Sequence, residues 1–202
     1  MWIHPKFNIN KKIYNFPVNV VKNKINTTDK SSISIVRATI QLFTESFNNT
    51  NGKYFVFCSQ NCIPLHDFNF INNFLNNVDK SIISFIDFNL KKRYYDLHEE
   101  IQNIISFDEF VKQQPNMILI RDDVKSIINN DFTKYFKNIQ CPDEHYFINI
   151  LIYILKKDII KSQTHFCNFD LTKTQALNFK SPSKLLINEL KNKGFLFMRK
   201  VY

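Results

Sequence analysis

Glycine is scarce in this sequence: Gly52 and Gly194 are the only two among 202 residues. Walker A loops and dinucleotide-binding fingerprints each need several glycines, because only glycine lets the backbone come close to a phosphate. The sequence therefore excludes both kinds of phosphate-binding loop. Any phosphate must be held by side chains or by helix N-termini.

Cysteine is also rare, since Cys58, Cys62, Cys141 and Cys167 are too few for a disulfide-stapled scaffold of this length. A zinc site is conceivable, because Cys58 and Cys62 are close in sequence and Cys141 lies near His145. Neither spacing is that of the usual tight zinc-binding pair. We therefore predict buried free thiols and no metal site.

The sequence has no signal-peptide pattern and no membrane-spanning segment. The longest apolar run, residues 146–155, is about half of the ~20 residues that a transmembrane helix needs. With neither signal nor anchor, we expect a soluble protein.

The composition is that of a globular chain, with 44% hydrophobic and 15% aromatic residues. Its length suits one substantial core, so we predict a single domain over residues 1–202. A net charge of +9 favours anionic partners: nucleic acid, a membrane surface or a phosphate-bearing small molecule. The lysines are scattered, however, and the densest cluster is only Lys91-Lys92-Arg93, so nucleic acid is the secondary interpretation.

Strand patterns alternate with helix patterns along the chain, which predicts an α/β sheet with helices on both faces. Predicted strands cover residues 53–58, 81–88, 116–120, 164–169 and 194–201, with a strand end near Trp2; predicted helices begin at Ser31 or Ser32, Asp67, Arg121, Pro142 and Ser181. Residues 91–114 are predicted to be a surface segment with a short helix near 107–111. Ligands in such sheets gather at the carboxyl ends of strands, where residues 59–65 should lie.

Residues 140–155 are the most informative stretch. Pro142 suits a first helical turn, and Asp143 and Glu144 would then lie at the positive end of the helix. A carboxylate held there above a buried helix face can act as a general base. Taken alone, the two carboxylates are better explained as complements to the helix dipole.

Six stretches together carry a family resemblance: residues 34–38, 54–65, 84–87, 113–121, 141–147 and 195–200. In this order they resemble the core-2/I-branching family of β-1,6-N-acetylglucosaminyltransferases, including its viral and plant relatives. The resemblance implies a GT-A-like, Rossmann-type mixed sheet. It also implies inverting transfer of N-acetylglucosamine from a UDP-sugar to a glycan hydroxyl; another UDP-sugar such as UDP-xylose remains an alternative donor.

The resemblance implies roles for particular residues. Glu144 corresponds to the catalytic base, and Arg199 and Lys200 correspond to the basic pair that grips the donor diphosphate. The chain has no Asp-x-Asp motif, so the two cations are expected to replace a metal ion, with no cofactor required. Ser59 and Cys62 belong to the loop over the donor, although some relatives have Asp in place of Cys62.

The acceptor pocket is expected to be lined by Asp143, Gln114, Phe166 and Phe169. Sugars stack on aromatic faces, but alternating Phe residues in a strand are more often plain core. At Gln114 the resemblance is weakened because Pro115 replaces the Trp of plant relatives.

The resemblance fails at the start of the chain, where residues 2–5 resemble the second strand of the family. The first strand and helix would then be absent, as are the Golgi anchor and stem of animal members. The sheet would have an open edge, which a second chain or an upstream segment could complete. The alternatives are a catalytically inactive glycan-binding remnant and a basic nucleic-acid-binding protein; a viral member would act in the host-cell cytoplasm or on the virus.

Overall fold

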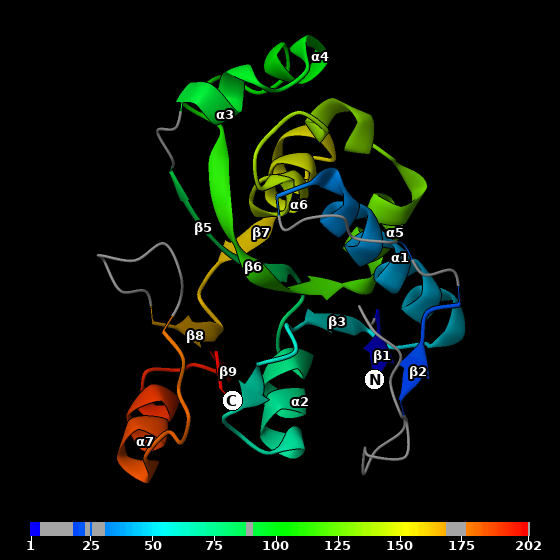
Figure 1. The fold of residues 1–202 in the computed structure, drawn as a ribbon. Coiled ribbons are helices and arrows are strands. Elements are labelled where there is room, and N and C mark those ends of the chain that lie inside the picture. The colour runs from blue at the N-terminus through cyan, green and yellow to red at the C-terminus, as the bar shows by residue number, and fades with distance from the viewer. Residues whose placement is uncertain (5–17, 23–24, 26–30, 88–90, 169–176, 202) are drawn as a thin grey trace.

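A computed structural model describes residues 1–4, 18–22, 25, 31–87, 91–168 and 177–201. Its centre is a four-stranded sheet in the order β3-β6-β5-β7 (Figure 1). The strands are β3 (Tyr54–Phe57), β6 (Val111–Ile120), β5 (Ser81–Asp87) and β7 (Ile159–Lys161). β6 runs antiparallel to both β3 and β5, whereas β5 and β7 are parallel, so the sheet is mixed.

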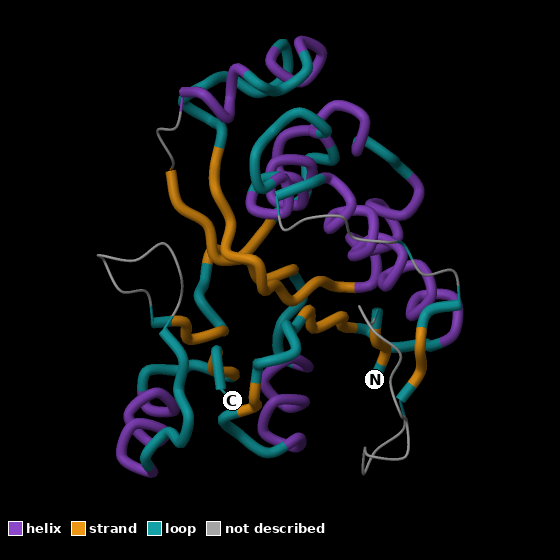
Figure 2. The backbone as a smooth tube through the Cα atoms, in the orientation of Figure 1, coloured by secondary structure: helices purple, strands orange, loops and turns teal. Residues whose placement is uncertain are grey.

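A second sheet of three strands carries the end of the chain. Its order is β4-β9-β8, formed by β4 (Ile63–Pro64), β9 (Phe197–Arg199) and β8 (His165–Cys167). β9 pairs antiparallel with β4 and parallel with β8, so the C-terminal strand lies between the loop that follows β3 and residues near 165. The tube in Figure 2 shows this sheet below the central one.

Helices cover both faces of the central sheet, as the sequence predicts. One face packs on α1 (Ile33–Asn49), α5 (Arg121–Asn129) and α6 (Tyr146–Asn149), and the other packs on α2 (Phe68–Asn76). Ser32 caps α1 and Asp67 caps α2, where the Asp67 carboxylate accepts from Phe70 N at 2.9 Å. The remaining helices are α3 (Lys91–Tyr95), α4 (Glu99–Gln102) and α7 (Lys184–Asn192).

Alternation along β6 decides which side chains reach which face. Val111, Met117 and Leu119 point into the large core beneath α1 and α6, whereas Ile118 points toward α2. The register with β5 shifts between Ile83 and Phe85, where residues 114–116 lie opposite Ser84 alone. This bulge falls in the part of β6 that borders the candidate site.

A buried polar contact joins the start of β5 to the start of α5. The Ser81 hydroxyl donates to Asp123 at 2.6 Å and accepts from Ile120 N at 3.0 Å. Lys157 lies 3.6 Å from the other oxygen of Asp123. Ser81 and Asp123 are almost fully buried, so these contacts satisfy polar atoms that would otherwise be buried without a partner.

Four sequence-based expectations about the elements are wrong. Residues 107–111 form no helix, because Glu109 turns back to accept from Ser106 N at 2.9 Å and β6 begins at Val111. Residues 91–114, predicted to be a surface segment, carry α3 and α4 and bury Tyr94, Ile101 and Phe110 in the core; β7 was not predicted at all. α7 begins after the cap Ser183, two residues beyond the predicted start.

The helix predicted to begin at Pro142 is interrupted. A 3₁₀ turn, Pro142–Glu144, is followed by α6 and then by a π-helical turn, Ile150–Ile154. His145 has φ −132°, which breaks the first turn from the rest. The Asn149 side chain bonds both Val111 N and Val111 O, at 3.1 and 2.8 Å, and so fixes α6 against the start of β6.

The N-terminal strand does not join the central sheet. β1 (Trp2–Ile3) pairs in parallel with β2 (Asn19–Val20), and within the described residues β3 is an edge strand. No helix in the described part of the chain has the length and apolar character needed to cross a bilayer.

Candidate active site

Glu144 is held by two cations from other elements. Its Oε2 lies 2.8 Å from Arg93 Nη1 of α3 and 3.2 Å from Lys112 Nζ of β6. The Glu144 side chain is 26% exposed, against 27% for Lys112 and 13% for Arg93, so this carboxylate is partly open to solvent. The sequence indicated Arg93 only as part of the densest basic cluster, and it gave no signal for Lys112.

A tight turn presents this carboxylate. Cys141 adopts a left-handed conformation at φ 54°, and Glu144 N then bonds Cys141 O at 3.0 Å. Pro142 occupies the first turn as predicted, where its missing N–H leaves no donor unsatisfied. The turn leaves Glu144 partly open to solvent, covers one oxygen of Asp143 and directs His145 into the core.

His145 supports Arg93 from the core. Its Nδ1 lies 2.9 Å from Val111 O, which can only accept, so Nδ1 carries the hydrogen. Burial lowers the pKa of His145 to about 4, which keeps the ring neutral. Nε2 then accepts from Arg93 Nη1 at 3.2 Å, so one guanidinium nitrogen contacts both His145 and Glu144.

Asp143 has a different environment from Glu144. Burial, followed by the neighbouring charge of Glu144, raises the pKa of Asp143 to about 6. Its Oδ1 is buried and has no hydrogen-bond partner among the described residues. The Asp143 carboxyl therefore keeps its proton to a higher pH than an ordinary aspartate does.

The predicted donor loop meets the second sheet. Ser59 Oγ and Cys62 Sγ are 3.2 Å apart, and Asn116 Nδ2 of β6 donates to the same sulfur at 3.5 Å. Cys58 Sγ lies 3.5 Å from Nε2 of His165 in β8. Sequence reasoning predicted Ser59 and Cys62 here, but Asn116 and His165 were missed because strand pairing brings them in.

Arg199 lies beside this loop. The neighbouring Cys58 thiol is the largest cause that lowers the pKa of Cys62, and burial is the largest for His165, whose pKa falls to about 3. The positive charge of Arg199 contributes to lowering both. Lys200 acts similarly on Cys167, although burial raises the pKa of that thiol overall. Ser59, Cys62 and Arg199 thus lie near one another in the structure.

One side of β6 extends from the residues around Glu144 to the loop of Ser59 and Cys62. Lys112, Gln114 and Asn116 occupy alternate positions, away from the large core. Gln114 accepts from Gln163 Nε2 at 3.3 Å, and that nitrogen also lies 3.3 Å from His165 O. Lys112 and Asn116 are four positions apart on the strand, which corresponds to at most about 13 Å. Among the described residues, no hydrogen bond or ion pair joins Glu144 to Arg199 or Lys200.

Comparison with known proteins decides the family. The family model described as "Core-2/I-Branching enzyme" matches residues 4–193. The chain belongs to the core-2/I-branching enzyme family. The matched range includes Glu144, Ser59, Cys62 and Gln114, and it ends before Arg199. No curated protein matches the chain.

Membership makes the chain a glycosyltransferase of the core-2/I-branching type, and the family implies a nucleotide-sugar donor and a glycan acceptor. One predicted acceptor residue, Phe169, lies outside the described residues. Phe166 packs against Phe195 and Phe179 with ring centroids 5.3 and 6.2 Å apart, beneath α7. These contacts are those of a core side chain, the alternative that strand alternation favoured.

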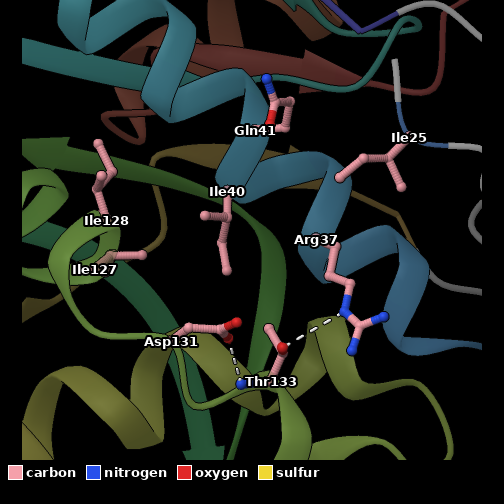
Figure 3. A pocket seen from close by; sticks show the side chains of 8 residues that line it. All are labelled: Ile25, Arg37, Ile40, Gln41, Ile127, Ile128, Asp131 and Thr133. Carbon is pink, nitrogen blue, oxygen red and sulfur yellow. Dashed lines mark hydrogen bonds between the residues drawn. The ribbon is translucent and has the colours of Figure 1, made fainter. Parts of the chain in front are cut away.

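A pocket of about 270 Å³ lies between α1 and the end of α5. Figure 3 shows its lining, in which Arg37 Nε donates to Thr133 Oγ1 at 3.5 Å and Asp131 accepts from Thr133 N at 2.8 Å. None of the residues predicted for the transferase site lines it. We therefore place the candidate active site along β6 and not in this pocket.

The part of the chain that the structure describes contains no group of three or more His, Cys, Asp or Glu side chains able to hold a metal ion. Cys141 and His145 lie in the turn that carries Glu144, whereas Cys58 and Cys62 lie in the loop after β3, so the four residues form no common metal site.

Proposed function

We propose that this core-2/I-branching family member transfers N-acetylglucosamine from UDP-N-acetylglucosamine to a glycan hydroxyl, with inversion and without a metal ion, on a GT-A-like fold. The observation that carries the proposal is the fixed carboxylate of Glu144, bound by Arg93 and Lys112 at one end of the polar side of β6. The donor loop and Arg199 lie toward the other end.

Glu144 is the proposed general base. Both of its ionic contacts use Oε2, which leaves Oε1 to accept the proton of an acceptor hydroxyl. As that proton transfers, the acceptor oxygen forms a bond to the anomeric carbon and the bond to the UDP oxygen breaks. A single displacement of this kind inverts the anomeric configuration.

Arg199 and Lys200 are the proposed diphosphate ligands. The departing UDP gains negative charge in the transition state, and fixed cations stabilise it there more than in the ground state. Arg199 contributes from the end of β9, next to the loop of Ser59 and Cys62. Asp143, with its buried oxygen at the same turn as Glu144, is proposed to bind an acceptor hydroxyl.

The test compares Glu144→Gln with wild type by release of UDP from UDP-N-acetylglucosamine in the presence of candidate acceptor glycans. Removing a general base is expected to lower turnover by about 10²- to 10⁴-fold. Glu99→Gln, an exposed carboxylate on α4, is the matched control and should retain turnover. Wild-type turnover by Glu144→Gln would refute the assignment of the base.

Calorimetry separates the transferase from an inactive glycan-binding remnant. The transferase binds both UDP and acceptor, and Arg199→Ala weakens the binding of UDP alone. A chelator should leave turnover unchanged. Binding of glycan without any binding of UDP would favour the remnant.

A further inference from the structure

The pocket between α1 and the end of α5 has an aliphatic wall. Its volume is about 270 Å³, and four isoleucines line it: Ile25, Ile40, Ile127 and Ile128. None of the lining residues that the structure describes is aromatic. Figure 3 shows Ile40 and Ile127 extending into the space above Asp131. A wall of branched aliphatic side chains favours a small aliphatic group over a sugar, whose hydroxyls would be left without partners there.

The polar end of the pocket is organised by Thr133. Its side chain is almost fully buried, at 2% exposure, and its Oγ1 accepts from Arg37 Nε at 3.5 Å. Its backbone N donates to Asp131 Oδ1 at 2.8 Å. Thr133 therefore lies between a cation and a carboxylate, as Figure 3 shows. The Thr133 hydroxyl hydrogen has no acceptor in the described part of the chain, so it can donate into the pocket.

The two charges beside Thr133 are not neutralised by the protein. Among the residues that the structure describes, no carboxylate lies within ion-pair distance of Arg37, and no cation lies within that distance of Asp131. Both side chains are exposed at the rim of the pocket, where a molecule from solvent can reach them. The guanidinium nitrogens beyond Nε remain available as donors, and Asp131 Oδ2 remains available as an acceptor.

We propose that this pocket binds a free aliphatic α-amino acid. The carboxylate of the ligand accepts from the Arg37 guanidinium and the Thr133 hydroxyl, and its ammonium group donates to Asp131. The aliphatic side chain packs against the isoleucine wall. The site is separate from the proposed transfer chemistry, because none of the residues proposed for donor, acceptor or base lines it.

The pair of opposite charges selects a zwitterion. A simple anion that reaches Arg37 also meets the negative charge of Asp131, and a simple cation at Asp131 meets Arg37. An α-amino acid carries both charges on adjacent groups, so it matches each side of Thr133 and leaves its apolar part for the wall.

The first test uses the wild-type protein and calorimetry with L-leucine, L-isoleucine and L-valine. At least one is expected to bind with a dissociation constant of about 1 mM or lower. For L-leucine the matched probes are 4-methylpentanoate, which lacks the ammonium, 3-methylbutylamine, which lacks the carboxylate, and glycine, which lacks the side chain. Each should bind at least about 10-fold more weakly than the amino acid. No saturable binding of the three amino acids, or equal binding of either singly charged probe, would overturn the proposal.

The second test changes the two charges singly. Arg37→Gln and Asp131→Asn should each weaken binding of the amino acid by about 10-fold or more. Lys125→Gln and Asp122→Asn, exposed positions on α5 that do not line the pocket, are the matched controls and should bind as wild type does. Wild-type affinity in either pocket variant would refute the assignment of the charges.

A third measurement separates this site from the transferase site. Saturating UDP should leave the affinity for the amino acid unchanged, whether or not the chain proves to be an active transferase. Competition between UDP and the amino acid would place both in one site and overturn the proposal.

Discussion

At the scale of single residues, Asp143 and Glu144 show how one position along a turn changes a carboxyl group. Glu144 faces Arg93 and Lys112, whereas Asp143 has a buried oxygen without a described partner and a pKa raised to about 6. A carboxyl whose pKa is raised on folding stabilises the folded state below its ordinary value of 3.8 and loses that contribution as the pH rises through about 6.

We therefore expect Asp143→Asn to be more stable than wild type at pH 7.5, by up to about 3 kcal/mol, with a gain below about 1 kcal/mol at pH 4.5. Urea denaturation at both pH values measures the free energy of unfolding. The exposed Asp108→Asn should show no such difference between the two pH values. If Asp143→Asn destabilised the protein equally at the two pH values, the Asp143 carboxylate would be well paired in the folded state.

Cys62 offers a second residue-scale prediction, which tests the donor site. If Arg199 binds the diphosphate, UDP will lie against the loop of Ser59 and Cys62 and should slow alkylation of Cys62 several-fold. Uridine, which has no phosphate, is the matched control ligand and should protect weakly. Alkylation by iodoacetamide followed by peptide mass mapping gives the rates, and a rate for Cys62 that UDP does not change would place the donor elsewhere.

At the scale of elements, the Arg121 side chain joins the start of α5 to the end of α1. α1 has no basic residue in its last turn, and Arg121 supplies a cation from the start of α5. Its guanidinium donates to Phe47 O at 3.1 Å, Thr50 O at 2.8 Å and Gly52 O at 3.3 Å, and it stacks 4.0 Å from the Phe47 ring. The planar group thereby closes the turn that leads into β3.

Arg121→Lys should lower the free energy of unfolding by about 2 kcal/mol, because an ammonium keeps the charge but cannot reach three carbonyls and a ring together. Lys125→Ala, an exposed position on the same helix, should change it by less than about 0.5 kcal/mol. Urea denaturation near neutral pH compares the two. If Arg121→Lys lowers the free energy of unfolding as little as Lys125→Ala does, the contacts of the Arg121 guanidinium contribute little to stability.

At the scale of the whole molecule, buried titratable groups determine the response to acid. Burial lowers the pKa of His145 from 6.5 to about 4 and that of His165 from 6.5 to about 3. Their contribution to stability is complete above pH 6.5 and is lost as the pH falls toward those values. Between about pH 4 and 6, unfolding takes up two protons at the histidines and releases one from Asp143.

The net uptake of one proton by these three groups predicts a loss of about 1.4 kcal/mol in the free energy of unfolding per pH unit between 6 and 4. In Asp143→Asn the opposing proton is absent, so the slope should rise to about 2.7 kcal/mol per pH unit. A series of urea denaturations across this range gives both slopes. Stability that is flat from pH 6 to pH 4 would mean that the histidines are protonated in the folded state.

The sequence was most informative where structure is local. Helical spacing and caps predicted α1 and α2, and short apolar runs predicted β3 and the second half of β6. The sequence predicted one continuous helix from Pro142, which was wrong, because Asn149 and His145 bind Val111 of a neighbouring strand. Ser59, Cys62 and Arg199 were placed together only through the family resemblance.

What the sequence determined by itself is the elements with clear local patterns, such as α1, α2 and β3, and the family, because caps, periodicity and motif order depend on residues that are neighbours along the chain. Tertiary structure alone decided the partners of the site. Arg93 meets Glu144 across 51 residues, and Cys58 meets His165 across 107. Such contacts follow from strand order and register, which short-range propensities do not encode.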